Sequence, residues 1–148
     1  MEPSTRHVPV LPGEVVAWLA PERGGVFVDC TLGLGGHTRL LLEAGADRVI
    51  GIDRDTGALA AAEAALGPLA SRVTFVHDDY RHLGAVLDAK GVGTVNGVLA
   101  DLGVSSMQLD DEGRGMSFRR DEPLDMRMDR TSGPTAADLL ATVEEGEL

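Results

Sequence analysis

The stretch DCTLGLGGHT, residues 29–38, determines how the rest of the chain is interpreted. It overlaps the short apolar run VFVDC (26–30), which is typical of a strand buried on both faces of a parallel sheet. Glycines at positions 33, 35 and 36 then crowd the turn and allow a ligand to approach the backbone closely. In an open parallel sheet, ligands bind beyond the carboxyl ends of the strands. The stretch therefore predicts a first βα turn that carries a binding site.

On either side of this turn, strand and helix patterns alternate at short spacing. Such alternation is typical of right-handed βαβ units, which build a parallel sheet flanked by helices. Asp55 is the expected N-cap of one of the helices, because aspartate accepts hydrogen bonds from free backbone N–H groups. The predicted fold class is α/β, with strands at 26–30, 48–53, 72–76 and 95–101 and helices at 12–20, 38–46, 55–68 and 81–91.

The pattern lapses after Asp101. Residues 102–134 are rich in Gly, Asp, Met and Arg, and no regular element is predicted there. A last helix is expected near Pro134, because Thr135 and Asp138 have the spacing of a capping box. The predicted organisation is an N-terminal arm and helix (1–24), a cofactor-binding βαβ core (25–101), an active-site or substrate loop (102–134) and the beginning of a helical segment (135–148).

The amino-acid composition limits the classes of function that the chain can have. A chain of 148 residues with 43% hydrophobic content fits one domain with a real core. No apolar run approaches the length of a membrane span and the N-terminus lacks signal-peptide features, so we expect a cytoplasmic protein without a membrane partner. The single cysteine, Cys30, excludes an internal disulfide and is expected to be a small buried hydrophobic residue. The net charge of -11 argues against nucleic-acid binding by bulk electrostatics.

A nucleoside-containing cofactor is indicated by Asp53, which ends the second predicted strand 20 residues after Gly33. An acidic residue at about this offset binds ribose hydroxyls. The turn reads GLGGH and does not match G-x-G-x-x-G, and no GKS or GKT marks a phosphate loop. Asp29 and Asp101 are both expected to face the site and to repel a pyrophosphate. The same carboxylates favour S-adenosylmethionine, which carries an ammonium and a sulfonium and no phosphate.

No metal is predicted. His77, Asp78 and Asp79 could be imagined as ligands, but consecutive residues in a loop more often cap a helix, and Asp79 is expected to do so.

Five stretches of the chain resemble the MraW (RsmH) family of bacterial ribosomal RNA small subunit methyltransferases. They follow the family's order and cover nearly the whole sequence; the run DLGVSS-x-QLD, followed by RG-x-SF and PLDMRMD, is the most specific part. The resemblance implies an incomplete Rossmann-like class I S-adenosylmethionine-dependent fold that contains the first four strands, because family members extend further. The matching stretches are HVPVLPGEVV (7–16), DCTLGLGGHT (29–38), GIDRD (51–55), LADLGVSSMQLDDEGRGMSF (99–118) and PLDMRMD (123–129).

The resemblance also implies a reaction, which is methylation of the N4 amino group of a P-site cytidine in 16S rRNA of the small ribosomal subunit. Asp101 is the expected catalytic residue, because the site must accept a proton or a hydrogen bond from the amine as charge develops. The implied cofactor contacts are made to the methionine portion by Gly35, Gly36 and His37, to the ribose by Asp53, to the adenine by Tyr80, and beside the methyl group by Asp101 and Gln108.

Two other functions stay open on the sequence. One is an S-adenosylmethionine-binding module without activity, and the other is a methyltransferase for a non-RNA substrate, which the acidic balance would suit. The fourth strand would have one uncovered edge, which favours association and makes a homodimer possible. The densest basic cluster is interleaved with acids, so a solvated, self-paired loop is favoured over RNA binding for Arg114, Arg119, Arg120, Arg127 and Arg130.

Overall fold

Parallel strands in the order β3-β2-β1-β4 form the centre of the fold, as the computed structural model of the chain shows for residues 8–147. These residues divide into two compact units, the first ending at Leu102 and the second beginning at Gly103. The first unit holds the sheet. Residues 1–7 of the predicted N-terminal arm lie outside the described residues.

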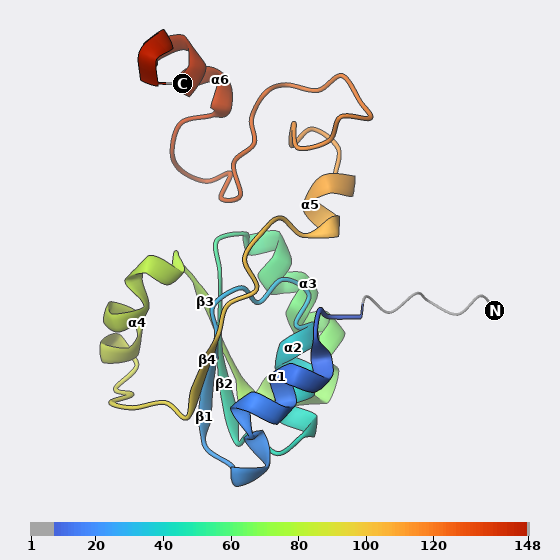
Figure 1. Cartoon of the computed structure of the whole chain (residues 1–148), viewed down its shortest axis with the longest axis vertical. Helices are drawn as coiled ribbons and strands as arrows, with labels where there is room; N and C mark the ends of the chain where they lie inside the picture. Colours follow the sequence, from blue (N-terminus) through green and yellow to red (C-terminus); the bar gives the residue numbers. More distant parts are fainter. Residues whose placement is uncertain (1–7, 148) are drawn as a thin grey trace, which may run out of the picture. The chain divides into compact units, whose positions relative to one another are not determined.

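The first unit contains every strand and helix that the sequence predicts for it. Helices α1, α2 and α3 cover one face of the sheet and α4 covers the other (Figure 1). This is the α/β arrangement expected from βαβ units with right-handed crossovers. The elements are α1 (Pro12–Leu19), β1 (Val26–Asp29), α2 (Gly36–Glu43), β2 (Arg48–Asp53), α3 (Thr56–Leu66), β3 (Val73–His77), α4 (Leu83–Ala89) and β4 (Gly97–Leu99), with 3₁₀ turns at Pro21–Arg23, Gly67–Arg72 and Tyr80–His82.

Strand β4 is shorter than the predicted run 95–101, because polar side chains end its pairing with β1. At its start, the side-chain oxygen of Asn96 accepts the backbone N–H of Val26 at 2.9 Å. After Leu99, the backbone N–H of Asp101 donates to the hydroxyl of Thr31 at 2.7 Å instead of to a neighbouring strand. Asp101 therefore lies just beyond the strand and not at its last position.

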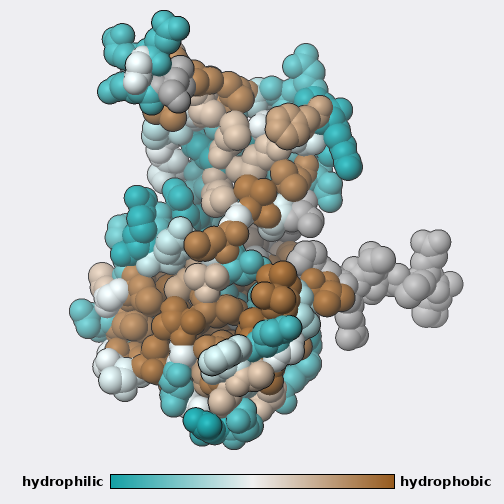
Figure 2. Space-filling view, in the orientation of Figure 1, coloured by the Kyte–Doolittle hydropathy of each residue, from teal (hydrophilic) through white to brown (hydrophobic). Residues whose placement is uncertain are grey.

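Strand β4 is also an edge of the sheet, since β1 is its neighbour and no described strand lies on its other side. Val98 is in register with Val28, which is in turn level with Ile50 on β2. Val28 and Ile50 are fully buried, whereas Val98 is 46% exposed. Figure 2 shows hydrophobic residues gathered over the face of the first unit on which β4 runs. The apolar surface of the sheet thus continues onto β4, where the described residues leave Val98 partly uncovered.

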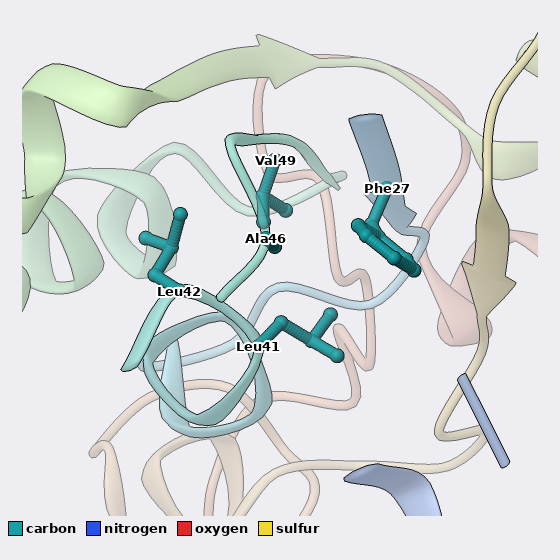
Figure 3. Close-up of a cluster of buried hydrophobic side chains, with 5 residues drawn as sticks. All are labelled: Phe27, Leu41, Leu42, Ala46 and Val49. Carbon is teal, nitrogen blue, oxygen red and sulfur yellow. The ribbon is translucent and has the colours of Figure 1, made fainter. Parts of the chain in front are cut away.

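The two faces of the sheet each carry a hydrophobic cluster. On the side of α1 and α2, five buried side chains pack together: Phe27, Leu41, Leu42, Ala46 and Val49 (Figure 3). On the side of α4, the buried cluster is Val28, Cys30, Ile50, Ile52 and Val86. Neighbouring positions of β1 alternate between these clusters, as strand geometry requires. Cys30 is a buried free thiol, which confirms the expectation for this residue.

The second unit contains α5 (Ser106–Asp110), α6 (Ala136–Thr142) and a 3₁₀ turn at Glu145–Glu147. The prediction that 102–134 holds no regular element is wrong at α5. Ser105 and Gln108 cap that helix reciprocally, since the Gln108 side chain accepts from the Ser105 N–H at 3.0 Å and Ser105 Oγ accepts from the Gln108 N–H at 3.2 Å. The sequence signal was the spacing S-x-x-Q, a capping box.

The two predicted helix caps are confirmed. Asp55 accepts from the backbone N–H groups of Gly57 and Ala58 at the start of α3. Thr135 and Asp138 form the full capping box of α6. Among residues 8–147, no helix has the length and apolar character needed to cross a bilayer.

Candidate functional site

The turn between β1 and α2 is held in place by backbone hydrogen bonds. Leu32 donates its N–H to the carbonyl of Ile52 on β2 at 3.0 Å, and Gly35 donates to the Leu32 carbonyl at 2.7 Å. Gly33 and Gly35 have φ values of 52° and 75°, in the left-handed region that disfavours other residues. A Cβ at Gly35 would also lie 3.2 Å from the Leu66 side chain. The glycines therefore allow a tight turn that packs closely on α3.

Asp53 connects this turn to the end of β2. Its Oδ2 accepts the N–H of Gly33 at 2.8 Å, and its Oδ1 accepts the N–H of Asp55 at 2.9 Å. The two residues that indicated a nucleoside site, 20 positions apart, are thus in direct contact. A carboxylate has about four acceptor positions. Because these two bonds use two of them, acceptor capacity is left for hydroxyl groups of a ligand.

Asp29 has a different position from the expected one, because it is buried inside the turn. The side chain is 1% exposed, and its oxygens accept from the Thr38 hydroxyl at 2.8 Å and the Thr31 N–H at 3.2 Å. Burial raises the pKa of the Asp29 carboxyl group, and the hydrogen bonds from Thr38 and Thr31 oppose that rise. Asp29 supports the turn from within, and sequence periodicity does not distinguish this from a carboxylate that faces a ligand.

Asp101 lies next to the same turn through its backbone. Its N–H donates to Thr31 Oγ1 at 2.7 Å, and the residue is exposed. Thr31 therefore links the segment that follows β4 to the turn that follows β1. Its own N–H donates to Asp29. The role of Thr31 could not be predicted from the sequence, because a threonine in a glycine-rich turn has no distinctive spacing. Asp53 and Asp101 are both tied to one loop, from opposite sides of β1.

His37, at the second position of α2, is buried. Its ring nitrogen Nε2 lies 2.8 Å from the carbonyl oxygen of Val10, so Nε2 carries the proton and donates. Gly36, the preceding residue, lies close to the ring of Pro9, since a Cβ at Gly36 would be 3.5 Å from that ring. The predicted methionine subsite at Gly35, Gly36 and His37 is thus also the place where residues 8–11 pack.

Tyr80 begins the 3₁₀ turn after β3 and is 42% exposed. The preceding Asp79 accepts from the Arg81 N–H at 2.9 Å and caps this turn, as predicted. Hydrogen bonds from Arg81 lower the pKa of Asp79. Among the described residues, no three His, Cys, Asp or Glu side chains gather in a way that could hold a metal ion. Because Tyr80 is partly exposed, the 3₁₀ turn presents an aromatic ring at the end of β3, the strand that neighbours β2.

Gln108 belongs to the second unit, where it is buried and caps α5 with Ser105. Its expected position beside the methyl group stays a prediction.

The arginine cluster of the second unit includes several ion pairs. Arg114 contacts Asp111 at 2.7 Å, and Arg120 lies 3.3 Å from Glu112. Arg127 donates two hydrogen bonds to the carboxylate of Asp125 and lowers the pKa of Asp125 well below its ordinary value. The self-pairing expected of this loop is thus found between Arg127 and Asp125. These three arginines are bound to acidic neighbours, which agrees with the favoured self-paired loop.

The loop that follows β1 thus collects groups from three strand ends. It has a carboxylate with acceptor capacity from β2, a backbone-anchored acid from β4, and its own glycines, of which Gly33 and Gly36 are partly exposed. A ligand with hydroxyls and positive charge fits this set better than a pyrophosphate, which an exposed carboxylate such as Asp101 repels.

The sequence is similar to known methyltransferases over nearly all of its length. A family model described as the MraW methylase family matches residues 4–148. The ribosomal RNA small subunit methyltransferase H of Sorangium cellulosum (strain So ce56) is 55% identical over 143 residues, which are 97% of this chain and 45% of the relative. The protein of the same name from Rhodopseudomonas palustris (strain TIE-1) is 52% identical, over 100% of this chain and 45% of its own length. The chain thus spans less than half of these relatives.

The fold is similar to that of a solved structure from Streptococcus mutans, a protein assigned as a methyltransferase and crystallised with SAH. The TM-score is 0.52 at 18% identity, and the match covers 67% of this chain and 56% of the other. At this identity the likeness concerns the fold alone. The parallel sheet flanked by helices is therefore an incomplete Rossmann-like class I methyltransferase fold, as expected.

Proposed function

The chain belongs to the MraW methylase family, and on this premise we propose that it is the S-adenosylmethionine-binding part of a methyltransferase for ribosomal RNA of the small subunit. The observation that carries the proposal is the convergence of Asp53 and Asp101 on the turn at 29–36. The bound SAH of the Streptococcus mutans protein supports the choice of cofactor, because SAH is the demethylated product of S-adenosylmethionine.

The residues of the first unit fit the parts of S-adenosylmethionine. Asp53 would accept the ribose hydroxyls with the lone pairs that Gly33 and Asp55 leave free. The half-exposed ring of Tyr80 would stack on the adenine. Gly35, Gly36 and His37 would line the methionine portion, at the end of the left-handed turn that follows β1.

We propose that the reaction is transfer to the N4 amino group of a P-site cytidine in 16S rRNA. When bound, S-adenosylmethionine supplies a methyl group activated by its sulfonium. The cytosine nitrogen forms a bond to that methyl as the sulfur–methyl bond breaks, and the nitrogen loses one proton. Asp101 would hold the amino group in line and accept a hydrogen bond, and then the proton, from it. Asp101 suits this role, because its backbone N–H is anchored to Thr31 while its exposed side chain keeps the carboxylate oxygens accessible.

The first test is single-turnover transfer of radiolabelled methyl from S-adenosylmethionine to isolated small ribosomal subunits. We expect label at N4 of a cytidine in 16S rRNA. Asp101→Asn should still bind S-adenosylmethionine but transfer methyl about 100-fold more slowly at saturating cofactor, the lower range for loss of a general base.

The control is Asp88→Asn, which removes an exposed carboxylate of α4 and should transfer at the unaltered rate. Equal rates for Asp101→Asn and the unaltered chain would reject the role of Asp101. Binding of S-adenosylmethionine without any transfer would favour the inactive binding module, and label on protein or small molecules would favour a non-RNA substrate.

A further inference from the structure

The segment at residues 8–11, which we call the arm, leads directly into α1 (Figure 1). Pro9 and Val10 of the arm contact Gly36 and His37 at the start of α2. Its side chains contribute little to this contact, because Val8, Val10 and Leu11 are 73%, 55% and 58% exposed. Hydrophobic burial of these residues therefore does not explain why the arm lies where it does.

Two contacts with the start of α2 hold the arm instead. The Nε2–H of His37 donates to the Val10 carbonyl at 2.8 Å, although the two residues are 27 positions apart. The Pro9 ring lies against the face of Gly36, where only a hydrogen occupies the side-chain position. His37 is 6% exposed, so the donor side of this hydrogen bond lies within the fold while Val10 is at the surface.

The backbone of the arm is strained at its junction with α1. Leu11 has φ 48° and ψ 46°, a left-handed conformation that a leucine rarely adopts. Such a conformation persists only where surrounding contacts enforce it. The contacts that can do so are those of Val10 and Pro9, immediately before it, together with the hydrogen bond that the Leu11 carbonyl accepts from the Val15 N–H at 3.0 Å.

From this geometry we propose that the arm forms a wall of the cofactor site and that His37 is the positioning residue that holds the wall in place. The proposal rests on the proposed function, because it takes Gly36 and His37 to line the methionine portion of S-adenosylmethionine. It assigns Nε2 of His37 to the Val10 carbonyl. Because the arm would be a wall of the occupied site, its ordering and the binding of the ligand would strengthen each other, and linkage makes the factor the same in both directions.

The holding role is tested without ligand, by the heteronuclear ¹⁵N NOE of the Val8, Val10 and Leu11 amides in the 148-residue chain. This measurement reports backbone order on the picosecond to nanosecond scale. The arm should be ordered in the unaltered chain and mobile in His37→Leu, which keeps bulk but has no donor. His37→Gln places an amide N–H where histidine has Nε2 and should restore order. An ordered arm in a folded His37→Leu variant would overturn the role of His37.

The matched control is His77→Leu. His77 Nε2 also lies 3.0 Å from a backbone carbonyl, that of Arg54, but at the end of β3. This substitution should leave the arm signals unchanged. Loss of arm order in His77→Leu equal to that in His37→Leu would show a general effect of histidine removal and contradict the assignment.

The coupling is tested by calorimetric titration with S-adenosylhomocysteine. The Kd should rise about fivefold in His37→Leu, the factor expected for one ordinary hydrogen bond, and return in His37→Gln. A variant lacking residues 1–10 keeps His37 and should show an increase at least as large. An unchanged Kd in that variant would overturn the wall and leave the proposed function standing. No binding by the unaltered chain would contradict the proposed function, while the NOE result would still decide what holds the arm.

Discussion

Single carboxylates near the turn differ in burial, and their burial separates their roles. Asp101 is exposed and anchored only through its backbone N–H, so its oxygens are accessible. Asp53 is half-buried and shares its oxygens between the turn and the start of α3. Asp29 is fully buried, and its oxygens serve Thr31 and Thr38. Of the three, Asp29 alone could be replaced by asparagine, which has the same shape but no charge, without removing a charge from the protein surface.

At Asp29 we expect a pH-dependent cost of ionisation. Because burial raises its pKa in the folded state, the folded chain holds the proton to a higher pH than the unfolded chain, whose value is about 3.9. Stability should therefore fall as pH rises from that value through the folded pKa. Asp29→Asn cannot ionise, so its free energy of unfolding, relative to the unaltered chain, should increase over this range. Urea denaturation at a series of pH values measures the difference.

Asp29→Ala is the companion variant, because it removes the acceptor as well as the charge. It leaves the Thr38 hydroxyl and the Thr31 N–H without their partner, which should cost about 1–3 kcal/mol at every pH. Parallel pH curves for Asp29→Asn and the unaltered chain would show that burial does not penalise the carboxylate.

At the scale of elements, capping residues determine where the helices begin. α3 has an alanine-rich body and begins directly after Asp55, whose side chain accepts from two backbone N–H groups. α6 begins at the capping box of Thr135 and Asp138. Hydrogen bonds from Thr135 lower the pKa of Asp138, so this cap favours the ionised carboxylate. Both caps are local, which is why they could be identified from spacing alone.

Asp55→Ala should lower the free energy of unfolding of the first unit by about 1 kcal/mol, the usual cost of losing an N-cap. Asp55→Asn keeps a side-chain oxygen at the same distance, so it should lower the free energy of unfolding by only a small part of that amount. Urea denaturation followed by circular dichroism measures both. Equal losses in the two variants would mean that charge at Asp55, and not capping, stabilises α3.

The contrast between local and long-range contacts also explains what the sequence could predict. Apolar runs, glycine turns and caps gave every strand and helix of the first unit, because each depends on neighbours in sequence. That Asp53 and the glycine turn belong to one site was anticipated from their 20-residue offset, but the hydrogen bond between Asp53 and Gly33 was not. The His37–Val10 and Thr31–Asp101 bonds join residues far apart without a characteristic spacing, so periodicity could not reveal them.

For the whole molecule, the open side of β4 is the main structural feature outside the site. Val98 continues the apolar row of Val28 and Ile50 and is half exposed beside an unpaired strand edge. Exposed edges of this kind pair with other chains unless they are covered or charged. The relatives are more than twice as long as the part that this chain matches, so they have further chain that could cover the edge.

We therefore expect the 148-residue chain to self-associate with rising concentration, and Val98→Lys to reduce this association by placing a charge beside the edge. Val104→Lys is the matched control, because Val104 is similarly exposed, at 51%, but belongs to the second unit. Sedimentation velocity over a range of concentrations distinguishes them. If Val98→Lys and Val104→Lys reduce the association equally, the contact between chains lies away from β4 or the effect comes from net charge alone.

Calorimetric titration of the folded chain measures whether the turn at 29–36 binds S-adenosylmethionine. We expect saturable binding of one S-adenosylmethionine per chain, no binding of NAD, and loss of binding in Asp53→Ala with the helical circular dichroism signal retained. Binding of NAD as well as S-adenosylmethionine, or unchanged binding of S-adenosylmethionine without the Asp53 carboxylate, would show that this turn is not an S-adenosylmethionine site of the proposed kind.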